Sequence, residues 1–120
     1  MPTPEGRVKA RVRQVLSEYG SQLYSYWPVP SGFGRTTVDV LGCYRGYFFA
    51  IEVKARGKKP TLRQTQVLGS MESAMGKTFI VDRIDSPVID DLRQWLDTLG
   101  ATINDDPHIT PDKTRRRAVV

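Results

Sequence analysis

Two acidic residues and a lysine lie in segments whose composition is typical of β-strands. Asp39 falls within residues 36–43, and Glu52 and Lys54 fall within residues 47–55. If these segments pair as an antiparallel hairpin, Asp39 lies directly opposite Glu52, with the two Cβ atoms about 4.5–5.5 Å apart. Side chains alternate along a strand, so Lys54 shares a face with Glu52. The spacing therefore predicts two carboxylates and one ammonium group on the same face of a hairpin.

This arrangement depends on the register of the hairpin. A two-residue turn at 45–46 sets Tyr44 opposite Tyr47 and places Thr37 across from Lys54. Arg-Gly is not among the preferred sequences for such a turn. A shift of the register by two residues would keep the acids on one face, whereas a shift by one would separate them.

Two carboxylates this close repel each other unless a cation lies between them. Mg²⁺ prefers oxygen ligands and often uses one or two carboxylates. It can polarise a phosphate and lower the pKa of a bound water, while Lys54 orients that water or stabilises negative charge. The alternative is a buried ion pair of Glu52 or Asp39 with Lys54 that performs no chemistry. Both interpretations explain why Glu52 lies inside the nearly apolar run 48–53 and why Lys54 follows it directly.

Two further polar residues face the expected core. Glu5 lies one helical turn before Val8 and is either a third acid near the metal or an acid stabilised by the helix dipole. Gln64 lies on the same side as Val67 and Leu68. It either hydrogen-bonds a phosphate or an active-site water, or is an ordinary residue at the start of a helix.

The periodicity of apolar residues predicts an αβββαβα order, an α/β domain with helices packed against a mixed sheet. The three helices each have a capping residue or proline at the start and a glycine at the end. The first helix is predicted to place Arg7, Lys9, Arg11 and Arg13 opposite its apolar side. The second helix is predicted to turn Val67, Leu68, Met71 and Met75 to one side. The expected helices are 4–19, 61–76 and 86–100, and the expected strands are 22–29, 36–43, 47–55 and 77–82.

The composition of the 120-residue chain suits one domain, expected at residues 1–100, followed by a flexible basic tail at 101–120. One cysteine and one histidine exclude an internal disulfide and a zinc site built from several cysteines or histidines. No apolar run suits a membrane span or a signal core, so we expect a cytoplasmic protein without membrane contact.

The positive charge is concentrated in the first half of the chain. Residues 1–63 carry eleven Lys or Arg and four Asp or Glu, a net +7, whereas residues 64–120 carry seven and nine, a net −2. This asymmetry indicates a polyanionic partner such as nucleic acid. A solvated surface that happens to be basic is the alternative.

The segments Val38-Asp39 and Ile51-Glu52-Val53-Lys54 together resemble the signature of the PD-(D/E)XK nuclease superfamily. The run from Thr61 to Gln64, with the apolar helix and glycine that follow, is similar to its VRR-NUC branch. The resemblance covers about residues 5–82 and implies a restriction-endonuclease-like αβββαβ core with an added C-terminal helix. Thr37-Val38 replaces the proline that usually precedes the aspartate, and proline is not a ligand there.

The resemblance also implies a set of roles. Mg²⁺, or Mn²⁺ in its place, would be held by Asp39, Glu52 and the Val53 backbone carbonyl, with Lys54 as the catalytic lysine and Glu5 as the matching helix acid. Stand-alone members of this size look like Holliday-junction resolvases and often form homodimers. Phosphates of the DNA would be bound by basic residues of the two loops that flank the acids, namely Arg35, Arg56, Lys58, Lys59 and Arg63.

The sequence therefore predicts a Mg²⁺-dependent DNA endonuclease selective for branched DNA. One alternative within nucleases is a nicking enzyme or an exonuclease of repair or restriction. An alternative of another class is a DNA-binding module without catalysis, and a third is a scaffold protein whose basic half binds RNA. A panel of junction, flap and duplex substrates separates the two kinds of nuclease. Binding without cleavage in magnesium identifies the DNA-binding module, and failure to bind or cut any DNA favours the scaffold protein.

Overall fold

The computed structural model describes residues 3–29 and 38–104. Its elements follow the predicted αβββαβα order, with one short 3-10 helix added after the first helix. None of the helices in these two ranges is long and apolar enough to cross a membrane. In chain order the elements are α1 (Pro4–Ser17), η1 (Gly20–Gln22), β1 (Leu23–Tyr26), β2 (Val40–Tyr44), β3 (Tyr47–Val53), α2 (Leu62–Ser73), β4 (Lys77–Val81) and α3 (Pro87–Asn104).

The four strands form one mixed sheet in the order β1-β2-β3-β4. The first three strands pair antiparallel, and β4 runs parallel to β3 after the crossover through α2. Tyr44 pairs with Tyr47 and Val40 with Ile51, so the predicted hairpin register is confirmed. Arg45 and Gly46 have φ values of 56° and 88°, and two positive φ values are what a type I′ turn requires. The turn thus sets the register of the hairpin, although an arginine is unfavourable at the first position, where φ is positive.

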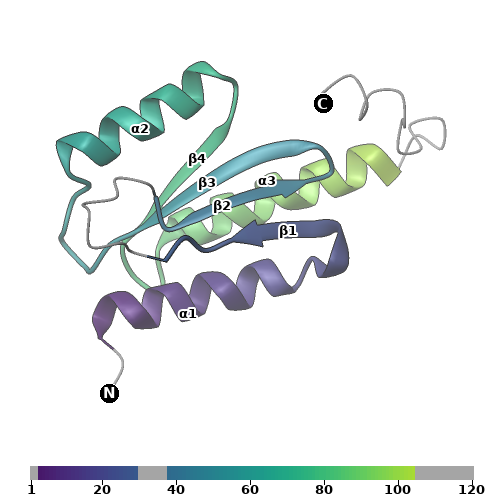
Figure 1. Ribbon diagram of the computed structural model, residues 1–120. Coiled ribbons are helices and arrows are strands. Elements are labelled where there is room, and N and C mark those ends of the chain that lie inside the picture. The colour runs from purple at the N-terminus through teal and green to yellow at the C-terminus, as the bar shows by residue number, and fades with distance from the viewer. Residues whose placement is uncertain (1–2, 30–37, 105–120) are drawn as a thin grey trace.

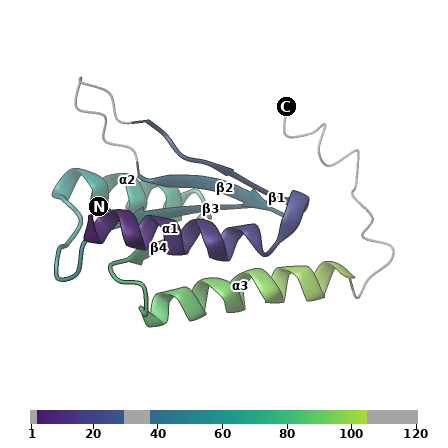
Figure 2. The ribbon, with the colours of Figure 1, turned by 90° about the horizontal axis from the view of Figure 1, so that it is seen from below.

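Helices cover both faces of the sheet. α1 and α3 lie against one face and α2 lies against the other (Figures 1 and 2). Alternation along β3 divides its side chains between the two, since Phe49, Ile51 and Val53 join the larger core and Ala50 joins the smaller one. The larger core includes Val8, Val12, Val15 and Leu16 from α1 and Ile89, Leu92 and Leu96 from α3.

The end of α2 differs from the sequence prediction. The helix ends at Ser73, and Met75 lies beyond it with φ 72° and a side chain that is 92% exposed. The prediction that Met75 packs inward was therefore wrong. The Gly76 N–H donates to the Met71 carbonyl and the Met75 N–H to the Glu72 carbonyl, the two bonds of a Schellman motif. Met75 occupies the left-handed position of that motif, where glycine is usual. The glycine that follows it serves close packing, since a Cβ at Gly76 would lie 2.7 Å from the Phe48 ring.

The last helix also extends beyond its predicted end. Gly100 was expected to end it, but α3 continues to Asn104. Gly100 is buried inside the helix, where an added Cβ would lie 3.1 Å from the Tyr44 hydroxyl oxygen. Glycine is present here for close packing against β2, which outweighs its low helix propensity. The helix thus continues four residues past the predicted domain boundary, and the proposed tail at 105–120 is outside the described residues.

Candidate active site

Asp39 lies in a bend immediately before β2, and its carboxylate takes the place of a backbone acceptor in the sheet. The Lys54 N–H donates to the Val81 carbonyl on β4 at 2.9 Å, so the N–H of the preceding residue, Val53, points to β2. There it donates to Asp39 Oδ2 at 2.8 Å. This bond fixes the Asp39 side chain at the end of the hairpin. It also follows that the Val53 carbonyl, which points to the same side as its N–H, is directed toward Asp39.

Glu52 is buried at the same end of the sheet, with 1% of its surface exposed. Its Oε2 lies 3.0 Å from Lys54 Nζ, so the ion pair considered from the sequence is present. That pair accounts for one oxygen only. The other oxygen, Oε1, is buried without a hydrogen-bond partner among the described residues. An unpaired carboxylate oxygen in an apolar setting is costly, and it is therefore a site where a cation would bind favourably.

The raised pKa of Glu52 also indicates that a cation would bind favourably at this site. Burial raises the pKa of Glu52 to about 7 from 4.5; Lys54 lowers it in part, and the negative charge of Asp39 raises it further. The Asp39 carboxylate is thus close enough to disfavour the ionised form of Glu52, as the predicted cross-strand arrangement requires. A single lysine does not offset both burial and the second carboxylate.

Lys9 of α1 joins this site, although its sequence position placed it on the solvent side of the helix. Its Nζ lies 3.4 Å from Asp39 Oδ1 and 3.4 Å from Glu5 Oε2. Burial lowers the pKa of Lys9, but attraction to Asp39 and the hydrogen bonds to Asp39 and Glu5 raise it by more. The only signal in the sequence was the i, i+4 spacing of Glu5 and Lys9, which favours an ion pair on a helix but not a contact with the sheet.

Glu5 is linked to Asp39 through Lys9, whose ammonium group pairs with both carboxylates. Its side chain is 43% exposed and pairs with Lys9 at 3.4 Å. Within the described part of the chain, no three His, Cys, Asp or Glu side chains group closely enough to hold a metal ion. The role of Glu5 as a third acid stays a prediction. The described site has two carboxylates, which suffices for magnesium where a carbonyl and water complete the shell.

Gln64 forms a capping box at the start of α2. Its Oε1 accepts the Thr61 N–H at 2.9 Å, and the Thr61 hydroxyl accepts the Gln64 N–H at 3.1 Å. These two bonds satisfy backbone N–H groups that the first helical turn leaves unpaired. The structural interpretation from the sequence is thus present, and contact of the Gln64 amide with a phosphate or water stays a prediction.

The predicted DNA contacts follow Lys54 along the chain. Four of them, Arg56, Lys58, Lys59 and Arg63, are exposed in the connection to α2 and in its first turn. The fifth, Arg35, lies outside the described residues. Exposed cations beside a pair of acids are suited to non-specific contacts with phosphates.

No family model matches the chain, and no curated protein matches it. A solved structure described as a VRR_NUC domain is similar, with a TM-score of 0.63, 21% sequence identity, and coverage of 77% of this chain and 96% of that chain. The described chain therefore has the fold of a VRR-NUC domain, an α/β restriction-endonuclease-like core with an additional C-terminal helix.

Proposed function

We propose that this protein is a metal-dependent DNA endonuclease that hydrolyses phosphodiester bonds at the Asp39–Glu52 site. The observation that carries the proposal is the buried Oε1 of Glu52, which has no partner among the described residues and lies beside a second carboxylate. A buried ion pair without chemistry explains Oε2 and Lys54 but leaves this oxygen unexplained. The VRR-NUC fold supports a nuclease activity for the same residues.

The donor set fits a hard divalent cation. Asp39, Glu52 and the Val53 carbonyl would be its protein ligands, all of them oxygens, which Mg²⁺ prefers and Mn²⁺ accepts. When bound, the cation would supply Lewis-acid activation of the scissile phosphate and of the attacking water. The hydrogen bond from Val53 to Asp39 Oδ2 holds that carboxylate in place before any cation arrives.

The surrounding cations have separate tasks in this proposal. Lys54 would stabilise the negative charge that develops on the phosphate, since its Nζ is held beside Glu52 at the end of β3. The exposed basic residues after β3, Arg56, Lys58, Lys59 and Arg63, would bind the DNA backbone. Binding through phosphates depends strongly on salt concentration, so DNA affinity should fall steeply as salt rises.

We further propose branched DNA as the preferred substrate and a homodimer as the active form. Both rest on the resemblance to stand-alone VRR-NUC enzymes, and the shared fold is what supports them. Cleavage of four-way junctions at a higher rate than linear duplex would support the first. A dimeric mass in solution, measured by light scattering, would support the second.

The deciding experiment incubates labelled four-way junction, flap and duplex DNA with the protein in magnesium and in EDTA. The wild type should cut in magnesium only. Asp39→Ala should abolish cleavage while DNA binding survives, because the basic residues remain. Asp91→Ala, which removes an exposed aspartate of α3, is the matched control and should cut like wild type. Binding of DNA by wild type without any cleavage would refute the enzyme and favour a non-catalytic DNA-binding module.

A further inference from the structure

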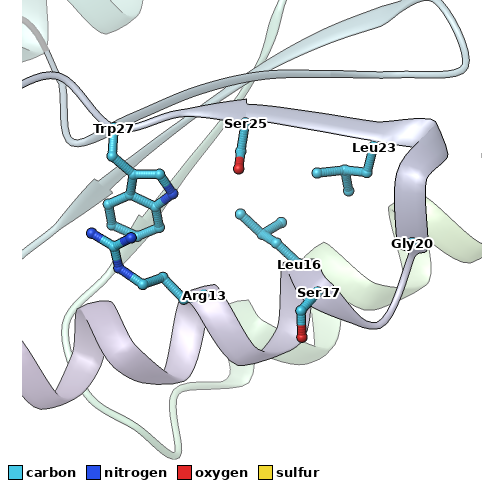
Figure 3. Close-up of a pocket in the computed structure, with 7 residues that line it drawn as sticks. All are labelled: Arg13, Leu16, Ser17, Gly20, Leu23, Ser25 and Trp27. Carbon is cyan, nitrogen blue, oxygen red and sulfur yellow. The ribbon is translucent and has the colours of Figure 1, made fainter.

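A cavity of about 280 Å³ lies between α1 and the edge strand β1 (Figure 3). Its walls are partly apolar, formed by Leu16 of α1 and Leu23 of β1, and the hydroxyl-bearing residues Ser17 and Ser25 also line it. It is smaller than the pockets that usually bind drug-sized ligands, which start at roughly 300 Å³. A ligand of one flat ring system with polar edges suits this size and lining.

One end of the cavity is formed by a stacked pair of side chains. The Arg13 guanidinium lies 3.9 Å from the centroid of the Trp27 ring, and the two residues lie together at one side of the cavity (Figure 3). Arginine stacked in this way keeps its N–H donors free at the edge of the plane, where they can bind a phosphate. The pair therefore brings an aromatic ring, one face of which Arg13 covers, and an anion-binding group to the same place.

The cavity begins close to the proposed metal site. Lys9 contacts Asp39, and Arg13 follows Lys9 by four residues on α1, so their Cβ atoms are about 5–6 Å apart. From the other side, Trp27 follows Tyr26, which pairs with Leu41, two residues after Asp39. Both elements that line the cavity thus pass next to Asp39. A DNA strand bound at Asp39 and Glu52 could therefore also contact Lys9 and then Arg13 along α1.

We propose that this cavity binds the base of an unpaired nucleotide of the DNA substrate next to the cleavage site, with Arg13 on a phosphate and Trp27 against the base. The inference rests on the proposed nuclease function and adds a reason for structure selectivity. A base inside a duplex is stacked and paired, so it is not available to enter the cavity, whereas the base of an unpaired nucleotide can be splayed out and can enter. Stacking on an aromatic side chain is independent of base identity, so the preference should be for structure and not for sequence.

The test measures binding in EDTA, where no cleavage occurs. The probes are a short blunt hairpin duplex and the same duplex with a single-stranded thymidine tail, both fluorescently labelled. Wild type should bind the tailed probe more tightly than the blunt one. Trp27→Leu removes the stacking surface and Ser25→Leu fills the cavity; each should weaken tailed-probe binding about tenfold and leave blunt-probe binding unchanged. The tail should also quench tryptophan fluorescence in wild type but not in Trp27→Leu.

The matched control is Tyr24→Leu, because Tyr24 is an exposed aromatic residue of β1 that does not line the cavity. It should leave both affinities unchanged, and a loss of tail preference in this variant would overturn the proposal. Arg13→Gln, a change at an exposed side chain, replaces Trp27→Leu if that variant does not fold. Unchanged tail preference in the folded cavity variants refutes the cavity site while the nuclease stands. Failure of wild type to bind either probe refutes the nuclease itself.

Discussion

Replacing Glu52 with glutamine is expected to stabilise the metal-free protein at neutral and alkaline pH. Glu52 has a pKa of about 7 in the folded protein, against 4.5 for an unperturbed carboxyl, chiefly because it is buried. Between these two values the folded state binds more protons than the unfolded state, so the stability of wild type falls as pH rises from 4.5 to 7 and is level above 7. Glutamine does not ionise, so the variant lacks this loss.

The size of the effect follows from the same shift. A rise from 4.5 to about 7 corresponds to about 3 kcal/mol. Glu52→Gln should therefore match wild type at pH 4 and exceed it by about 3 kcal/mol at pH 8, which raises Tm by roughly 10 °C in a domain of this size. If the carboxylate instead serves as one half of a stabilising buried ion pair with Lys54, its removal should cost about 3–5 kcal/mol. The two explanations predict opposite signs.

Urea unfolding in EDTA, followed by circular dichroism at several pH values, measures this difference. Asp91→Asn neutralises an exposed carboxylate and is the control for a change of one charge. Magnesium should raise the stability of wild type, by about 2.7 kcal/mol at a hundred times its Kd, and should leave Glu52→Gln unaffected. A Glu52→Gln variant that is less stable than wild type at pH 8 would refute this reasoning. It would show that Lys54 alone offsets the cost of burying the Glu52 carboxylate.

Three other substitutions test separate features of the structure. Lys9→Met removes an ammonium group that lies 3.4 Å from Asp39 and competes with a divalent cation. Calorimetry should therefore show that Mg²⁺ affinity rises about tenfold, a gain of about 1.4 kcal/mol. Equal or weaker Mg²⁺ binding would show that Lys9 does not compete. Met75→Gly relieves a left-handed backbone at φ 72° and should stabilise the fold by about 1 kcal/mol in thermal unfolding, whereas a loss would mean that the exposed side chain is important. Gly42→Ala places a methyl group that overlaps the outer edge of the Phe49 ring, which is fully buried. It should cost about 1–3 kcal/mol, and an unchanged Tm would mean that the ring can move aside.

The central hairpin could be predicted from the sequence because its geometry is local. A two-residue turn at 45–46 was enough to predict the register, which the pairing of Val40 with Ile51 confirms. Asp39 was expected inside the strand but lies in a bend just before the paired residues. The capping residue Thr61 was predictable for the same reason, since its bonds reach only three residues along the chain. Local steric and hydrogen-bonding rules need no knowledge of the remaining fold.

Other features depend on how distant elements pack. Lys9 looked like a solvent-facing residue because periodicity describes a helix by itself, and only the placement of α1 against the end of β2 brings its ammonium group to Asp39. Gly100 looked like a helix end, but contact with Tyr44 explains the glycine and lets the helix continue. Gly76 also looked like a helix end, but its lack of a side chain serves close packing against Phe48.

The sequence by itself determined the order of the elements, the register of the hairpin and the types of residue available for chemistry at Asp39, Glu52 and Lys54. These follow from the pattern of apolar residues and from turn chemistry within a few residues. Only the tertiary structure decided that Glu52 Oε1 has no partner among residues 3–29 and 38–104, that Lys9 contacts Asp39 and that a cavity lies between α1 and β1. Burial and close contact between segments far apart in the chain arise from packing, which no local pattern specifies.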